Sequence, residues 1–167
     1  RNPMSSDSIR RPLLPVLSSP LRRLLGIVLI LFGLLAVNSL YLVSVTLAEW
    51  ISGSMQQNYF YLLMFLGHLT LGLALIGPAL VFGALHLRRA WGRPNRYAVG
   101  AGLSLYASAI GVFATGILLT RFGFFEVNDP QVRSASYWVH VLTPLALIWL
   151  FVLHRLAGPR LKWRRGA

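Results

Sequence analysis

Four long apolar stretches dominate the chain, at residues 24–48, 60–86, 97–120 and 135–156, and short polar segments separate them. Each is long enough to cross a hydrocarbon core of about 30 Å, for which about 20 helical residues suffice. Charged or aromatic side chains mark the ends, such as Arg22-Arg23 before the first stretch and Tyr59-Phe60-Tyr61 at the second. The pattern predicts an all-α fold, an integral membrane four-helix bundle over residues 24–156.

The two ends of the chain do not share this pattern. Residues 1–23 contain four prolines, among them Pro12, Pro15 and Pro20, interspersed with serines and arginines, and we expect an irregular lead-in to the first span. Residues 157–167 form a short basic tail. The first apolar stretch is too long for the core of a signal peptide, so we expect it to be a retained span.

Composition supports a membrane protein and limits its chemistry. The chain has 167 residues, of which 56% are hydrophobic and only 12% charged. It contains no cysteine, which excludes disulfides, thiolate zinc sites, iron–sulfur clusters and covalent haem attachment. Any metal or cofactor must therefore be held by histidine, methionine or oxygen ligands.

The positive charge, +12 in total, follows the connections between the apolar stretches. Of the 16 basic residues, 14 lie before the first stretch, between the second and third, or from the end of the fourth onward, and only Arg121 and Arg133 lie elsewhere. By the positive-inside rule, both termini are cytoplasmic. The charge is thus explained by topology and contact with anionic lipid, and we expect no nucleic acid partner. The asymmetry and compactness favour a prokaryotic inner membrane.

All four histidines lie in the second and fourth stretches. At about 100° per helical residue, the 18-residue step from His68 to His86 returns to the same face, and the 14-residue step from His140 to His154 returns nearly to it. The two spans run in the same direction. We therefore expect an outer pair, His68 with His140, and an inner pair, His86 with His154.

Two imidazoles facing each other between helices are typical of the ligands of a b-type haem. Zinc is the competing metal, but it prefers four ligands at one site and each level offers two. The alternative without a metal is four histidines that are only hydrogen-bonded within the bundle. The histidine steps correspond to about 27 Å and about 21 Å of helix, so a bend must absorb about 6 Å. Pro78 and Pro144 offer such bends, and His86 is the ligand expected to be lost if they do not suffice.

Small and basic residues near the histidines extend this hypothesis. Glycines leave room for a flat cofactor, although they also serve close helix packing. Arginines suit haem propionates. The candidates for cofactor packing are Gly67, Gly72, Gly83, Gly102 and Gly116, and those for propionate binding are Arg88, Arg89 and Arg155 inside and Arg121 and Arg133 outside.

With these residues, the chain resembles the four-helix di-haem b-type membrane cytochromes, most closely the N-terminal haem-bearing half of cytochrome b of bc-type complexes. The spacing of His140 and His154 and the interval from Gly102 to Gly116 carry the resemblance, whereas the spacing of His68 and His86 departs from it. The b561-like cytochrome b subunits of other oxidoreductases are a comparable match. The resemblance implies iron ligation by His68, His140, His86 and His154, two haem b groups, and a larger redox complex.

These features predict electron transfer across the membrane, with quinone as an exchange partner. Glu49 and Glu126 lie at the outer side and are candidate proton acceptors for quinol, although both also suit an ordinary solvated loop. We expect other membrane subunits and a periplasmic redox protein, either a c-type cytochrome or an iron–sulfur protein. The alternative function is a haem-free anchor or assembly subunit. A small transporter is less favoured, because no membrane-embedded acid is seen.

Overall fold

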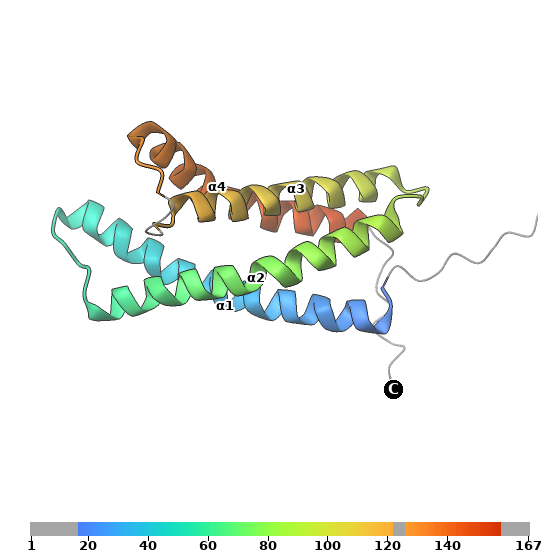
Figure 1. The fold of residues 1–167 in the computed structure, drawn as a ribbon, viewed down its shortest axis with the longest axis horizontal. Coiled ribbons are helices and arrows are strands. Elements are labelled where there is room, and N and C mark those ends of the chain that lie inside the picture. Colours follow the sequence, from blue (N-terminus) through green and yellow to red (C-terminus); the bar gives the residue numbers. More distant parts are fainter. Residues whose placement is uncertain (1–16, 122–125, 158–167) are drawn as a thin grey trace, which may run out of the picture.

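The computed structural model describes residues 17–121 and 126–157, and four helices account for nearly all of them (Figure 1). Each helix is long and apolar enough to cross a membrane. The predicted all-α four-helix membrane bundle is thus confirmed, and the chain is a multi-pass integral membrane protein. The helices are α1 (Ser19–Ser52), α2 (Tyr59–Ala90), α3 (Arg96–Leu119) and α4 (Pro130–Ala157).

The helices extend beyond the predicted spans, most of all in α1 and α4. Residues 19–23, which we expected in an irregular lead-in, are helical. Pro20 explains the difference, because proline is favoured in the first helical turn, where its missing N–H costs nothing. Residue 120 is the C-cap of α3 instead of its last helical residue. Residues 1–16 of the lead-in and 158–167 of the tail lie outside the described part of the chain.

Short polar residues define the helix ends. The Asn58 side chain accepts from the N–H of Tyr61 at the start of α2, and Asn95 does the same for Ala98 at the start of α3. Gly53 ends α1 with φ 65°, a left-handed conformation that glycine adopts without strain. These caps fix the lengths of the two connections at residues 53–58 and 91–95.

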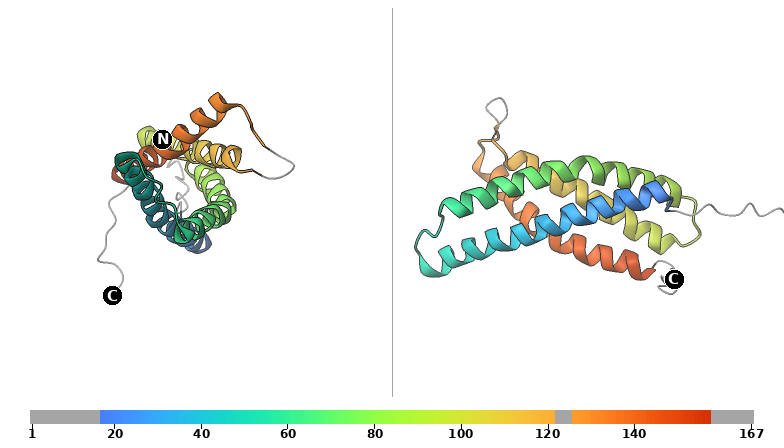
Figure 2. Two further views of the ribbon diagram at one scale, coloured as in Figure 1. Left: turned by 90° about the vertical axis from the view of Figure 1, so that its left-hand side faces the viewer. Right: turned by 90° about the horizontal axis from the view of Figure 1, so that it is seen from below.

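The helices form two antiparallel hairpins, α1 with α2 and α3 with α4, and α2 and α3 also touch. Figure 2 shows this arrangement along the bundle and from below. Among the described residues, no Cα atom of α2 lies within 8 Å of a Cα atom of α4, and the same holds between α1 and α4. The backbones of the two histidine-bearing helices therefore stay apart.

Nearly all apolar side chains of the described residues are at least partly exposed at the surface of the bundle. In the described chain, only Leu21, Leu75, Asn38 and Ser136 are buried, whereas Leu40 is 71% exposed and Leu145 65%. In a bilayer this surface faces lipid tails, so exposed leucine is no penalty. Polar residues inside the bundle are then the unusual feature, and Asn38 is one of them.

Both histidine-bearing helices contain an internal proline, Pro78 in α2 and Pro144 in α4. A proline inside a helix removes one backbone hydrogen bond and bends the helix. For Pro144 the carbonyl that loses its partner is that of His140, four residues earlier. The first part of α4 leans away from the bundle (Figure 1). This bend lies close to Pro144, one of the two prolines that we expect to absorb the unequal spacing of the histidines.

Candidate metal centre

The histidines of α2 and α4 meet in two pairs, as their spacing predicts. The ring centroids of His68 and His140 are 6.1 Å apart, and those of His86 and His154 are 5.9 Å apart. The rings of each pair are nearly perpendicular, at 77° and 81°. The length mismatch between the two helices is therefore absorbed, and His86 is not lost from its pair.

The separation within each pair suits a metal ion held between two imidazoles. A metal–nitrogen bond is about 2 Å long and a ring nitrogen lies about 1 Å from its centroid, which gives a centroid separation of about 6 Å. Direct edge-to-face ring contact gives separations in the same range, about 4.5–7 Å. The surroundings of each ring must therefore distinguish the two interpretations.

Backbone carbonyls of α3 fix the two histidines of α4. The Nδ1 atom of His140 lies 3.1 Å from the carbonyl oxygen of Val112, and that of His154 lies 3.0 Å from the carbonyl oxygen of Ala98. A carbonyl can only accept, so each neutral imidazole must carry its proton on Nδ1. The lone pair is then on Nε2, which is the form that a metal ligand requires.

Two glycines of α3 make this approach possible. A methyl group added at Gly116 would lie 2.9 Å from Cε1 of His140, and one added at Gly102 would lie 3.0 Å from Cε1 of His154. Each glycine follows its carbonyl partner by four residues, so it lies on the same face of α3 one turn later. The absence of a side chain at Gly102 and Gly116 thus leaves the space in which the rings of His154 and His140 lie.

The histidines of α2 are held differently. Nδ1 of His68 lies 3.3 Å from the hydroxyl oxygen of Ser39 on α1. The Nδ1 atom of His86 is buried and has no hydrogen-bond partner among the described residues. The ring of His86 instead stacks on Phe82 with centroids 5.3 Å apart. Three of the four rings therefore have a polar neighbour at Nδ1.

The other candidate packing glycines have different neighbours. Gly83 lies against the ring of Tyr106, whose hydroxyl donates to the carbonyl of Leu80 at 3.1 Å. A methyl group added at Gly67 would lie 3.5 Å from the Asn38 side chain, and one at Gly72 would meet no described heavy atom within 4 Å. Gly83 thus brings α3 against α2, while neither Gly67 nor Gly72 is in contact with a histidine of α4.

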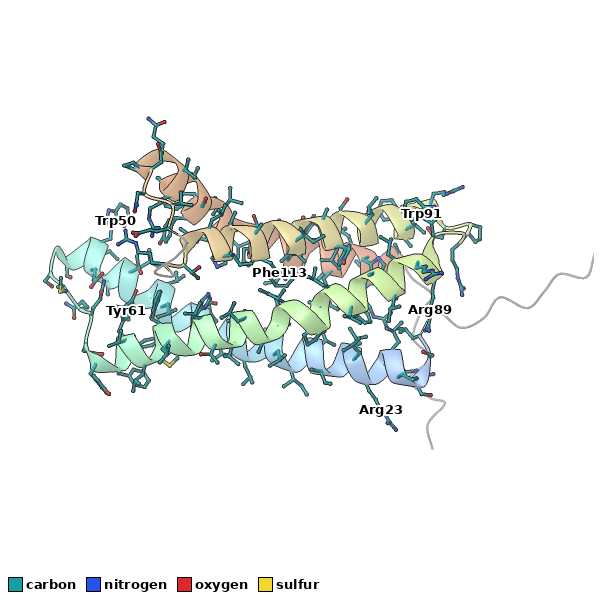
Figure 3. All side chains as sticks on the ribbon, viewed as in Figure 1. Arg23, Trp50, Tyr61, Arg89, Trp91 and Phe113 are labelled. Atoms are coloured by element: carbon teal, nitrogen blue, oxygen red, sulfur yellow. The ribbon has the colours of Figure 1, made fainter. Side chains whose placement is uncertain are left out.

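The candidate propionate arginines divide between the two ends of the bundle. Arg121 pairs with Glu126 at 3.3 Å, and Arg133 donates to the carbonyls of Val127 and Leu119. Both outer arginines are therefore engaged with the connection from α3 to α4. Arg89 lies at the inner end (Figure 3) and donates to Ser18 at 2.8 Å. Arg88 and Arg155 lie in the last turns of α2 and α4.

The candidate acid Glu49 lies at the end of α1 and binds the next connection. Its carboxylate accepts from the backbone N–H of Gln56 at 3.0 Å and from the side chain of Gln57 at 3.2 Å. A shallow, largely open pocket of 380 Å³ lies beside this connection, lined by Gln57, Asn58, Tyr61, Leu62 and Phe65. Tyr61 precedes His68 by two helical turns, so the pocket lies at the outer pair's end of α2.

The donor set at each level suits a metal group that would take two imidazole nitrogens from the protein. In residues 17–121 and 126–157, no group of three or more histidine, cysteine, aspartate or glutamate side chains is placed to hold a metal ion. A closed four-ligand zinc site is therefore not formed by this part of the chain. At the outer level, both imidazoles have a polar partner at Nδ1 and would hold haem iron through Nε2. At the inner level, His154 has such a partner and His86 has none among the described residues.

The sequence interpretation missed the polar residues that orient the rings. Ser39 contacts His68, and the hydroxyl of Thr115 lies 3.4 Å from Nδ1 of His140. The signal was present, because Asn38-Ser39 is a polar pair in the middle of an apolar span, and such residues face the interior of a bundle. The carbonyls of Val112 and Ala98 carry no sequence signal of their own.

Comparison of the chain with known protein families, with curated proteins and with solved structures gives no match in any of the three.

Proposed function

We propose that this protein transfers electrons across a membrane through two haem b groups, one held by His68 and His140 and the other by His86 and His154. The observation that carries the proposal is the pair of imidazole contacts at 6.1 Å and 5.9 Å between helices whose backbones stay apart. Haem held in this way supplies one-electron exchange between ferric and ferrous iron.

The residues of the chain have three roles in this proposal. The four imidazoles hold the iron, and the carbonyls of Val112 and Ala98 keep two of them in the ligating tautomer. The apolar faces of the helices exclude water from the pairs, which tunes the redox potential. Because His140 and His154 are 14 residues apart, the two levels are separated by about 21 Å along α4, so together they extend most of the way across a bilayer.

Electron transfer across the membrane can be tested in proteoliposomes. Purified protein with its native cofactor content is reconstituted around entrapped ferricyanide, and a membrane-impermeant reductant is added outside. We expect ferricyanide reduction that is lost in both His140→Ala and His154→Ala, because each removes one level of the path. Leu145→Ala, which changes an exposed residue of the same helix, is the matched control. Equal rates in all four proteins and in empty vesicles would contradict the proposal.

We further propose that quinol is the electron donor at the outer end, with the 380 Å³ pocket as its binding site. Gln57, Asn58 and Tyr61 offer polar groups for a quinol ring, while Leu62 and Phe65 line an apolar wall suited to its tail. Glu49 lies beside Gln57 and is the candidate proton acceptor. A c-type cytochrome or iron–sulfur protein completes the proposed complex as a redox partner.

Substitutions beside the pocket test whether quinol donates electrons at the outer end. Glu49→Gln should slow haem reduction by a soluble quinol analogue by about 100-fold or more, the lower end of the effect of a positioned base. Tyr61→Phe, which removes a polar group of the pocket, should slow it less. Reduction by dithionite should be unchanged, because it needs no binding site. Glu126→Gln is the control, since its carboxylate pairs with Arg121. Unchanged quinol-driven rates in both variants would remove the pocket from the proposal.

A further inference from the structure

The hairpin of α3 and α4 repeats one arrangement at two levels. Val112, Gly116 and His140 form the outer unit, and Ala98, Gly102 and His154 form the inner unit, each residue 14 positions from its counterpart. The Nδ1 to carbonyl distances, 3.1 Å and 3.0 Å, are nearly equal. One difference remains, because Thr115 contacts His140 while Ala101 occupies the same place in the inner unit.

The hairpin of α1 and α2 repeats with a step of 18 residues, from His68 to His86. Two hydrogen bonds fix its register, between Ser39 and His68 and between Ser18 and Arg89. In antiparallel helices, the residue number rises along one helix as that of the facing residue falls along the other. The two bonds fit one such register, because from one to the other both helices advance by 21 residues. That register places Leu21 opposite His86, where Ser39 stands opposite His68. Leu21 is buried, at 3% exposure.

The two outer hydroxyls act as acceptors toward the histidines. Ser39 donates its hydroxyl hydrogen to the carbonyl of Leu35 at 2.7 Å, and Thr115 donates to the carbonyl of Gly111 at 2.8 Å. Each oxygen therefore turns a lone pair to the adjacent imidazole, which donates through Nδ1–H. Both outer rings are thus held in the same tautomer, with Nε2 unprotonated.

A buried amide strengthens the outer level. Asn38 is 6% exposed and donates to the carbonyl of Met64 at 2.9 Å. Met64 precedes His68 by one helical turn, so this bond ties α1 to the turn of α2 that carries the ligand. Pro20 stands 18 residues before Asn38 and has no donor to offer. The inner level therefore lacks the amide as well as the hydroxyl.

We propose that Ser39 is a positioning residue that holds His68 as the Nδ1–H tautomer, with Thr115 as a second acceptor beside the Val112 carbonyl at His140. Leu21, at the place in the inner level that corresponds to Ser39, leaves His86 without a Nδ1 partner. The outer pair is then preorganised as a ligand set and binds haem more tightly than the inner pair. The tighter haem binding by the outer pair rests on the proposed function. The tautomers of the histidines are a property of the chain alone and do not require a metal.

The tautomer is measured directly in the metal-free chain. We expect the ¹⁵N spectrum of histidine-labelled protein in micelles to show Nδ1–H forms for His68, His140 and His154, and exchange between tautomers for His86. Ser39→Ala should bring exchange to His68, and Ser39→Thr, which keeps the hydroxyl, should restore the single form. Ser44→Ala is the control, because Ser44 donates to Tyr41 on the same helix. A single Nδ1–H form of His68 in Ser39→Ala would overturn the positioning role.

Haem titration tests the consequence. Single-level variants isolate each pair, since His154→Ala leaves only the outer pair and His140→Ala only the inner. We expect tighter binding to the outer pair, a loss of about 10-fold there on Ser39→Ala, and a gain at the inner pair on Leu21→Ser, in line with the 10–100-fold effect of such partners. Equal affinities of the two pairs would overturn the preorganisation. Binding to neither pair would contradict the proposed function, and the ¹⁵N spectra would then decide the positioning role by themselves.

Discussion

The two hairpins of this bundle hold their histidines by different means. In α3 and α4, backbone carbonyls accept from His140 and His154 at nearly equal distances, and a glycine makes room for each ring. In α1 and α2, a side chain, Ser39, contacts His68, while His86 has no Nδ1 partner in the described structure. A carbonyl is present whatever the residue, whereas a hydroxyl must be supplied by the sequence. The positions of His140 and His154 should therefore depend on the space left by the glycines, and that of His68 on the hydroxyl of Ser39.

A side chain added at Gly116, in the space next to the His140 ring, should have the largest effect on haem affinity. In Gly116→Val, the added Cβ would lie 2.9 Å from Cε1 of His140, so the ring must leave the Val112 carbonyl. We expect haem affinity at the outer pair to fall by about 100-fold, with the inner pair unchanged. Gly111→Val on the same helix is the control, because a Cβ there meets no described atom within 4 Å. An equal loss of haem affinity in Gly116→Val and Gly111→Val would mean that a general effect of valine on α3, and not the contact with His140, is responsible.

Straightening α4 should have the next largest effect. In Pro144→Ala, the carbonyl of His140 gains a helical partner and the bend is relieved. The two levels would then be separated by unequal lengths of α2 and α4, and we expect outer-pair haem affinity to fall by about tenfold. Spin labels on α2 and α4 should report the change in helix direction. The control is Leu145→Ala, which changes an exposed residue next to the proline. If Pro144→Ala and Leu145→Ala have the same haem affinity, the bend has no role in pairing the histidines.

The contact between the hairpins should contribute less. Tyr106→Phe removes the hydrogen bond to Leu80 but keeps the ring against Gly83. Hydrogen bonds between membrane helices contribute about 0.6 kcal/mol on average, so the free energy of unfolding in detergent should fall by about that amount. Tyr97→Phe, at an exposed position of α3, should leave it unchanged. A loss of several kcal/mol would show that Tyr106 holds the hairpins together.

The smallest effect is expected at the outer ion pair. Arg121 and Glu126 are 64% and 40% exposed, and surface pairs of this kind contribute about 0–1 kcal/mol. Arg121→Gln should therefore change neither stability nor the haem spectrum measurably. A shifted spectrum of the outer haem in this variant would instead give Arg121 the role of a propionate partner.

The fold could be predicted from the sequence because its signals are long and redundant. Each apolar stretch exceeds the length of a membrane span, and no other regular structure satisfies its backbone there. The meeting of histidines from α2 and α4 was also predictable, since helical phase and the direction of the spans determine which faces meet. The start of α1 was not, because Pro20 suits both a loop and a first helical turn.

The surroundings of the histidines were harder to predict. The carbonyls of Val112 and Ala98 have no identity in a sequence, and their use depends on a side-chain approach of about 3 Å that helical phase does not resolve. The glycines are visible in the sequence, but a missing Cβ does not say whether a helix, a cofactor or an imidazole ring takes its place. Ser39 could have been found, because polar residues inside a span require a partner.

If each imidazole pair holds one haem, the purified chain should show a b-type reduced-minus-oxidised spectrum and contain two haems per polypeptide. Each of the four single histidine-to-alanine variants should then contain one haem. A purified chain that is folded and contains no haem would contradict haem binding by the histidine pairs and favour a haem-free anchor subunit.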